Sequence, residues 1–280
     1  MAGQPEEPST LPAETPFLRA IPRRDLRAML VCAAATLAVE IGAYAIARTS
    51  GTIARDSLVA ALAAATMWVA LASATMAAGG EGNWSAALRG AVPAGASLAA
   101  MLALWPVARM PEGNCYLTLA GVLEAWCVLA AMAAFSVAAV CCGRGRAARA
   151  AFSLAAAAVL ASAVADPFWT SGIIAAMKPD YHAQTSVVAW AVRANPFYSV
   201  VAADAETLRF FWHELGLMYS RVKTFPNYSP PPIQWYTAAG IYAALGAVLG
   251  LVAFLRSSRC VRGGPIAVRP SDDDASRWGK

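Results

Sequence analysis

The sequence predicts an all-α, polytopic membrane protein with six transmembrane helices. Hydrophobic residues occupy 59% of the 280 positions and charged residues only 14%, which is too apolar for a water-soluble domain with a polar surface. A helix needs about 20 apolar residues to cross a hydrocarbon core roughly 30 Å thick. Six runs fit this length: Ala28–Ala47, Ser57–Ala78, Gly90–Ala108, Tyr116–Cys142, Ala150–Val164 running on toward Phe168, and Ile233–Leu255.

The runs divide the chain into three parts. Residues 1–27 form a polar flank that we expect to be partly disordered, with an amphipathic segment at the membrane interface just before the first span. Residues 28–255 form the membrane domain. Residues 256–280 are predicted to be a disordered polar tail. Gly, Ala and Ser are plentiful in all six spans, which favours close helix packing in a compact bundle.

The arginines predict the orientation of the spans. They gather before the first run (Arg19, Arg23, Arg24, Arg27), between the fourth and fifth (Arg144, Arg146, Arg149) and after the sixth (Arg256, Arg259, Arg262, Arg269). With six spans, all three clusters lie on one side, and an excess of Arg in short loops marks the cytoplasmic side. We therefore expect both termini in the cytoplasm. Because the clusters adjoin apolar runs and form no continuous basic face, they do not indicate nucleic-acid binding.

The long segment between the fifth and sixth runs, residues 166–232, is then extracytoplasmic. The stretch TSVVAWAVRA is a helix candidate that stops at Asn195, because the residue before Pro196 is pushed out of the helical region. Helical spacing resumes from Phe197 to Tyr219. Two short helices that meet at Asn-Pro predict an elbow whose apolar residues face the outer membrane interface.

Six spans, cytoplasmic termini, an amphipathic segment before the first span and an elbow before the sixth together resemble the ABC-2 type permease family. The stretch ANPFYSVVAADAETLRF, with Asn195, Pro196 and Arg209, is similar to the outer elbow of that family. The resemblance implies a membrane subunit of an ATP-driven transporter in the inner or plasma membrane, an exporter of unidentified cargo. It also implies a homodimer or a pairing with a second permease.

A second similarity to this family lies between the second and third predicted spans. The family carries a cytoplasmic Glu-rich stretch there, followed by Leu and Pro, and GGEGNWSAALRGAVP has Glu81, Trp84, Leu88 and Pro93 in that order with fewer charges. The chain has no GxxxxGK[ST] sequence to hold ATP phosphates, so we expect hydrolysis on a separate ATP-binding subunit and no enzyme activity in this chain. The resemblance implies that Glu81, Trp84, Leu88 and Arg89 contact that subunit; the alternative is an ordinary polar turn.

Two glutamates fall inside predicted spans. Glu40 and Glu124 each lie about eight residues from the outer end of a span, roughly 12 Å deep at 1.5 Å per residue. A carboxyl group at this depth is costly and marks a cavity, an ion route or a partner. Three interpretations stay open: a polar translocation surface, a pair that shares a proton or a cation, and structural hydrogen-bonded groups. No Lys or Arg within the spans offers a counter-ion.

Other function classes follow from the same residues. A proton- or cation-coupled secondary carrier would use Glu40 and Glu124, although the sequence shows none of the internal repeats typical of such carriers. A membrane scaffold without transport activity is a third possibility. His182 and His213 match no zinc-ligand spacing, and we expect no cofactor, no metal and no catalytic residues.

Overall fold

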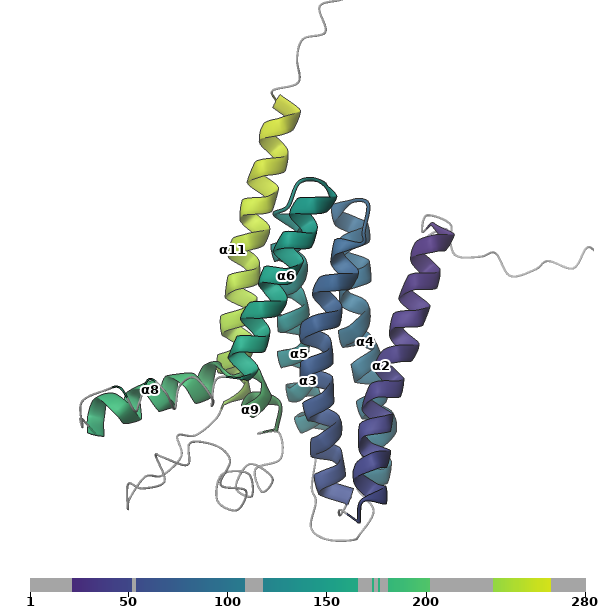
Figure 1. Ribbon diagram of the computed structural model, residues 1–280, viewed down its shortest axis with the longest axis vertical. Helices are drawn as coiled ribbons and strands as arrows, with labels where there is room; N and C mark the ends of the chain where they lie inside the picture. Colours follow the sequence, from purple (N-terminus) through teal and green to yellow (C-terminus); the bar gives the residue numbers. More distant parts are fainter. Residues whose placement is uncertain are drawn as a thin grey trace, which may run out of the picture.

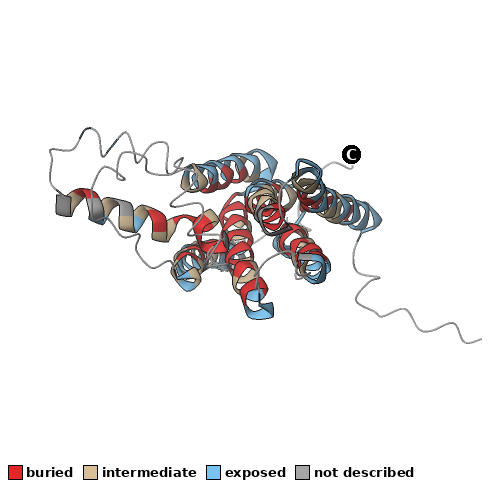
Figure 2. Cartoon of the chain, turned by 90° about the horizontal axis from the view of Figure 1, so that it is seen from below, coloured by how far each residue is buried: buried red, intermediate tan, exposed pale blue. Residues whose placement is uncertain are grey.

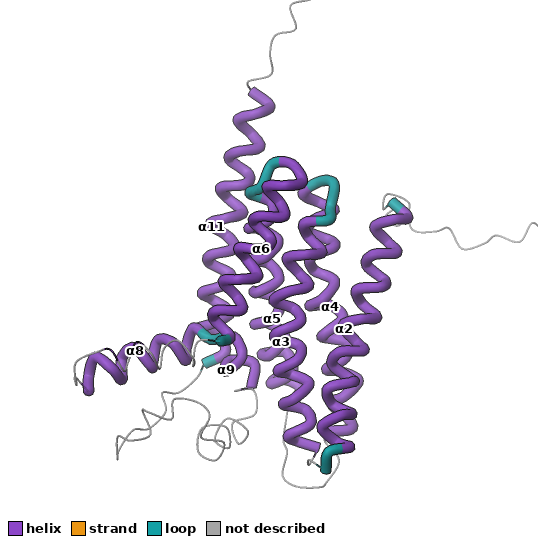
Figure 3. Tube along the Cα trace, viewed as in Figure 1, coloured by secondary structure: helices purple, strands orange, loops and turns teal. Residues whose placement is uncertain are grey.

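The computed structural model describes residues 22–51, 54–108, 118–165, 173, 176, 181–201 and 234–262. Within these ranges all regular structure is helical, and Figure 3 colours it as helix joined by short loops. The predicted all-α fold class is confirmed.

Six helices are long and apolar enough to cross a membrane. They are α2 (Arg23–Thr49), α3 (Ala54–Ala78), α4 (Asn83–Ala108), α5 (Leu119–Cys141), α6 (Gly145–Val164) and α11 (Trp235–Arg262). They match the six predicted runs one to one, so the prediction of six membrane-length helices is confirmed, and it supports a multi-pass membrane protein. Two shorter helices, α8 (Tyr181–Ala194) and α9 (Pro196–Val201), lie between α6 and α11 in the chain.

Most of the six long helices run past the predicted span boundaries; α4, for example, begins at Asn83 instead of Gly90. The first begins at Arg23, so residues 23–27 continue the span as helix. The last continues to Arg262, so the structure differs from the disorder predicted for residues 256–262. Near this end the hydroxyls of Ser257 and Ser258 donate hydrogen bonds to the Phe254 carbonyl, at 2.7 and 3.1 Å. Such local bonds satisfy polar groups as the helix leaves its apolar part.

The fifth helix, α5, occupies the centre of the bundle. Its neighbours are α3, α4, α6 and α11, whereas α2 packs against α3 and α4 at one side (Figure 1). Val128, Leu129 and Met132 of α5 are fully buried among them, and Figure 2 shows buried residues on the inner faces of the helices. Small residues let these backbones approach closely; at Gly90 of α4, for example, a Cβ would collide with Val137 of α5.

The two ends of the bundle differ. One end holds the start of α2, the α3–α4 and α5–α6 turns and the end of α11 (Figure 1); we call it the basic end, because its described residues include Arg23, Arg24, Arg89, Arg144, Arg146, Arg149 and Arg256. The opposite end holds α8 and α9, and we call it the elbow end. Both described termini thus lie at the basic end, as six spans require, and the side of the membrane that this end faces remains a prediction.

Candidate functional site

The turn that joins α3 to α4 at the basic end is short and tightly packed. It comprises residues 79–82. A Cβ on Gly80 would lie 2.5 Å from the backbone nitrogen of Ala86, and one on Gly79 would lie 2.5 Å from Nη2 of Arg89. Glycine is needed where backbone and side chains approach this closely. The predicted contact segment, residues 81–89, is therefore a brief turn followed by the first turns of α4.

A partly buried ion pair holds this turn against α2. Arg89 Nη1 lies 3.2 Å from Asp25 Oδ1, with side-chain exposures of 13% and 9%, and the same nitrogen donates to the Gly79 carbonyl at 2.6 Å. The Ser85 hydroxyl donates to the other carboxylate oxygen of Asp25. Because Asp25 accepts two charge-assisted or hydroxyl hydrogen bonds from α4, the first turns of α2 and α4 are fixed to each other.

Two further arginines fix the start of α6. Arg149 Nη1 donates to the Gly80 carbonyl, and its Nη2 donates to Asn83 Oδ1 at 3.2 Å. Arg144, next to the α5–α6 turn, donates from Nη2 to the Arg256 carbonyl of α11 at 2.6 Å. At the basic end, arginine side chains therefore link neighbouring helices by hydrogen bonds to the adjacent turn or helix.

These contacts surround a polar cavity of about 520 Å³. Its charged lining consists of four arginines and two acids, namely Arg24, Arg89, Arg146, Arg149, Asp25 and Glu81, and its remaining walls are Ala78, Gly79, Gly80 and Gly145. The lining has an excess of two positive charges, which favours an anionic group in the cavity or at its mouth.

The four residues predicted to contact an ATP-binding subunit separate into two groups. Glu81 and Trp84 are exposed, Trp84 at 68%, and Leu88 is half-buried. Arg89 instead faces inward, onto Asp25 and the Gly79 carbonyl. A partner can therefore contact Glu81 and Trp84 directly, whereas the hydrogen bonds of Arg89 stabilise the turn. No local pattern indicates this ion pair, because its two members lie 64 positions apart in the chain.

The intramembrane Glu40 is enclosed between α2 and its neighbours. It is 1% exposed, and its Oε1 makes no hydrogen bond within the described residues. Ser97 of α4 faces the carboxyl group. One turn earlier on α2, Thr36 accepts a 2.9 Å hydrogen bond from Trp68 Nε1 of α3. These groups form a small buried polar cluster where α2, α3 and α4 meet.

The second intramembrane carboxyl group lies elsewhere. Glu124 is half-buried on α5, which is not among the helices that pack extensively on α2. Glu40 lies nine residues from the end of α2 and Glu124 five from the start of α5, about 13 and 8 Å along the two axes. The structure does not bring the two glutamates together. In the described part of the chain no three His, Cys, Asp or Glu side chains are grouped as metal ligands would be.

The Asn-Pro break at the elbow end joins two helices. The backbone N–H of Asn195 donates a hydrogen bond to the Ala191 carbonyl at the end of α8. The side-chain Oδ1 of Asn195 accepts a 2.9 Å hydrogen bond from the backbone N–H of Phe197 in the first turn of α9. This is the geometry of a helix N-cap followed by proline at the first helical position. Asn195 Nδ2 also donates to the Val164 carbonyl at the end of α6, at 3.4 Å.

The shorter elbow helix, α9, is packed into the bundle rather than lying on it. It contacts α3, α5 and α11, and Tyr198, Ser199 and Val200 are at most 1% exposed. Tyr242 of α11 donates from its hydroxyl to the Ala194 carbonyl at 3.0 Å. In contrast, α8 projects sideways from the bundle (Figure 1), with Trp190 63% exposed. The predicted elbow residue Arg209 lies outside the described residues.

Comparison of the chain with models of protein families, with curated proteins and with solved structures finds no match.

Proposed function

We propose that this chain is the membrane subunit of an ABC-2 type transporter, an exporter in the inner or plasma membrane, whose ATPase is a separate chain. The basic end carries the proposal. There Trp84 and Glu81 are exposed beside a turn that Asp25, Arg89 and Arg149 fix to α2 and α6. A rigidly held, exposed tryptophan suits a partner contact that must pass movement to several helices at once, because aromatic side chains are frequent anchors of interfaces.

The elbow end supports the same proposal. The Asn195–Pro196 break, on which the family resemblance rests, joins a buried helix to a projecting one. Asn195 contacts α6 and Ala194 contacts α11, so the break lies where these two spans meet at the elbow end. In the proposed transporter the elbow caps the cargo route, and the basic end faces the cytoplasm in accordance with the arginine excess.

Co-purification tests the proposal. The chain carrying a C-terminal tag is extracted from its native membrane in mild detergent, and bound proteins are identified by mass spectrometry together with vanadate-sensitive ATP hydrolysis. We expect a P-loop ATPase in the wild-type sample and its loss from Trp84→Ala. The matched control is Trp190→Ala, because Trp190 is similarly exposed, at 63% against 68%, but lies at the elbow end. Recovery of the chain alone, without ATPase activity, contradicts the proposal.

One observation favours a second candidate, a proton-coupled carrier. Glu40 is buried beside Ser97, and within the described residues its Oε1 makes no hydrogen bond; such a carboxyl group can exchange a proton during transport. The test is proton flux into nucleotide-free proteoliposomes that contain a pH-sensitive dye. Flux that Glu40→Gln abolishes and Glu124→Gln retains would favour the carrier over the ATP-driven subunit. Absence of flux in the wild type contradicts it.

A further inference from the structure

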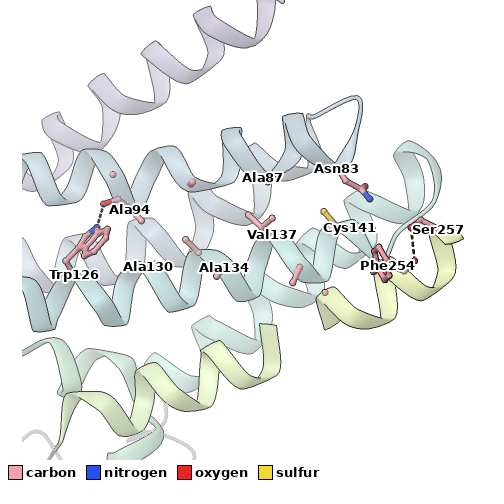
Figure 4. Close-up of a pocket in the computed structure, with 16 residues that line it drawn as sticks. Asn83, Ala87, Ala94, Trp126, Ala130, Ala134, Val137, Cys141, Phe254 and Ser257 are labelled. Atoms are coloured by element: carbon pink, nitrogen blue, oxygen red, sulfur yellow. Dashed lines mark hydrogen bonds between the residues drawn. The ribbon is translucent and has the colours of Figure 1, made fainter. Parts of the chain in front are cut away.

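A groove of about 700 Å³ runs along the membrane-spanning part of the bundle, between α4 and α11 and over α5 (Figure 4). Both outer helices pack on α5, and small side chains cover the part of α5 between them. The small residues recur every four positions, as Ala87, Ala91 and Gly95 on α4 and as Ala130, Ala134 and Ala138 on α5. This spacing places them on one face of each helix.

The length of the groove is close to the thickness of a single membrane leaflet. Its lining on α4 begins at Asn83 and reaches Gly95, twelve residues and therefore about 18 Å. Half of a hydrocarbon core of about 30 Å is close to this length. Trp126 lies at the deep end, where its Nε1 donates to the Ala94 carbonyl at 3.0 Å. The indole N–H is thereby satisfied, and an apolar surface faces the groove.

The residues that line the mouth of the groove at the basic end are polar and uncharged, and arginines lie beside them. Asn83 and Ser257 line it on either side (Figure 4). Arg149 donates to Asn83 Oδ1 at 3.2 Å, and Arg144 donates to the carbonyl of Arg256, the neighbour of Ser257. Within the described residues, the recorded ion pair is that of Asp25 with Arg89, so no carboxylate there pairs with Arg144, Arg149 or Arg256.

We propose that this groove binds an anionic phospholipid of the leaflet at the basic end. One acyl chain lies along the small residues of α4 and α5, and the phosphate lies at the mouth near Arg144 and Arg256. An amphiphile with an anionic head matches both parts of the site, since basic pockets between transmembrane helices hold acidic lipid head groups. The apolar lining alone would accept any acyl chain; the arginines supply the selectivity.

The charge of the mouth also argues against a second copy of the chain in the groove. A copy inserted in the same orientation has its own basic end at the same level of the membrane. Its arginines would then approach Arg144 and Arg256, and like charges brought together across an interface are unfavourable. A phosphate group at this position instead neutralises the excess.

Native mass spectrometry tests the site. The full-length protein is transferred from detergent into mixed micelles with equal amounts of phosphatidylglycerol and phosphatidylcholine that have identical acyl chains, and the lipids retained on the protein are counted. We expect retained phosphatidylglycerol to exceed retained phosphatidylcholine by about tenfold, the effect of two favourable arginine contacts of moderate strength. Soluble glycerol phosphate should not displace the lipid, because it lacks the chain that fills the groove.

Two variant pairs separate the two parts of the site. Ala134→Phe fills the groove from an exposed position on α5 and should lower phosphatidylglycerol retention about tenfold, whereas Ala158→Phe, an exposed position on α6 outside the groove, should not. The double variant Arg144→Gln with Arg256→Gln should abolish the preference for phosphatidylglycerol. Arg27→Gln removes an exposed charge of α2 outside the groove lining and should retain it.

Several outcomes would overturn the assignment. Equal retention of the two lipids by the wild type would contradict the proposed recognition of the anionic head group. Efficient displacement by glycerol phosphate assigns the arginines to a free anion instead. Loss of a dimer in Ala134→Phe, with lipid retention unchanged, would assign the groove to a second copy of the chain.

Discussion

Neighbouring helices are linked by different interactions at the two ends of the bundle. At the basic end, charged side chains join neighbouring helices, as Asp25 with Arg89 and Arg149 with the Gly80 carbonyl. At the elbow end the links are neutral hydrogen bonds from Asn195 and Tyr242, and a helix buried in the bundle adds apolar contact. The stability of the helix contacts at the elbow end therefore depends on the volume of buried side chains. At the basic end it depends on pairing of opposite charges that are partly exposed to solvent.

The largest effect is expected at the elbow end. Tyr198→Ala removes a side chain that is 1% exposed, and emptying such a site costs about 3–5 kcal/mol. We expect a correspondingly lower free energy of unfolding in detergent, followed by near-ultraviolet circular dichroism. Tyr236→Ala is the control, because Tyr236 is 54% exposed. Equal losses in the two variants would mean that α9 is not held by its burial.

At the basic end, Asp25→Asn should cost about 2–3 kcal/mol, because it leaves the Arg89 guanidinium in a partly buried site without its counter-charge. The measurement is the same unfolding transition at low and at high salt. The double variant Asp25→Asn with Arg89→Gln should recover part of the loss, since the uncompensated charge is gone. If the double variant is less stable than Asp25→Asn by the full cost of Arg89→Gln alone, the two residues are not coupled.

The packing of the α3–α4 turn can be tested with two glycines of that turn, Gly80 and Gly82. Gly80→Ala places a Cβ 2.5 Å from the Ala86 backbone nitrogen, whereas a Cβ on Gly82 meets nothing within 4 Å. We expect a loss of about 1–3 kcal/mol for Gly80→Ala and a change within about 0.5 kcal/mol for Gly82→Ala. Thermal unfolding of the two variants side by side measures the difference, and identical midpoints would contradict the tight turn.

The smallest expected effect concerns the Asn195 side chain. Asn195→Ala removes the cap on the Phe197 amide and the bond to the Val164 carbonyl, at a cost of about 1–2 kcal/mol. Asn195→Asp keeps the oxygen that caps α9 but loses the Nδ2 donor. An intermediate unfolding free energy for Asn195→Asp is therefore expected. A cost equal to that of Asn195→Ala would assign the whole effect to the link with α6.

The spans were predictable because each is a local run of apolar residues whose length a membrane sets. The Asn195–Pro196 break was also predictable, since proline acts on its immediate neighbour. The helix starts at Arg23 and Asn83 were missed because polar first turns carry no apolar signal. The continuation of α11 past Leu255 was missed for the same reason at the other end of a helix.

The site was less predictable because it depends on which helices become neighbours. Glu40 and Glu124 have similar positions within the predicted spans, yet α2 and α5 are not close packing partners. Asp25 and Arg89 lie 64 positions apart in the sequence, and only the fold brings them to within 3.2 Å of each other. The four-residue spacing of small residues on α4 and α5 was visible in the sequence, but the groove exists only because α11 packs on the other side of α5.

At the elbow end, a small rotation at the base of the projecting helix α8 moves its far end by a larger distance. Its 14 residues make a rod about 21 Å long, which contacts α11 near its end and joins α9 through one non-helical residue, Asn195. A rotation of about 10° at the base of this rod moves its far end by about 4 Å, by the geometry of a rod of this length. Asn195 contacts α6 and Ala194 contacts α11, so a distance probe near Ala183 would record a shift between these two helices.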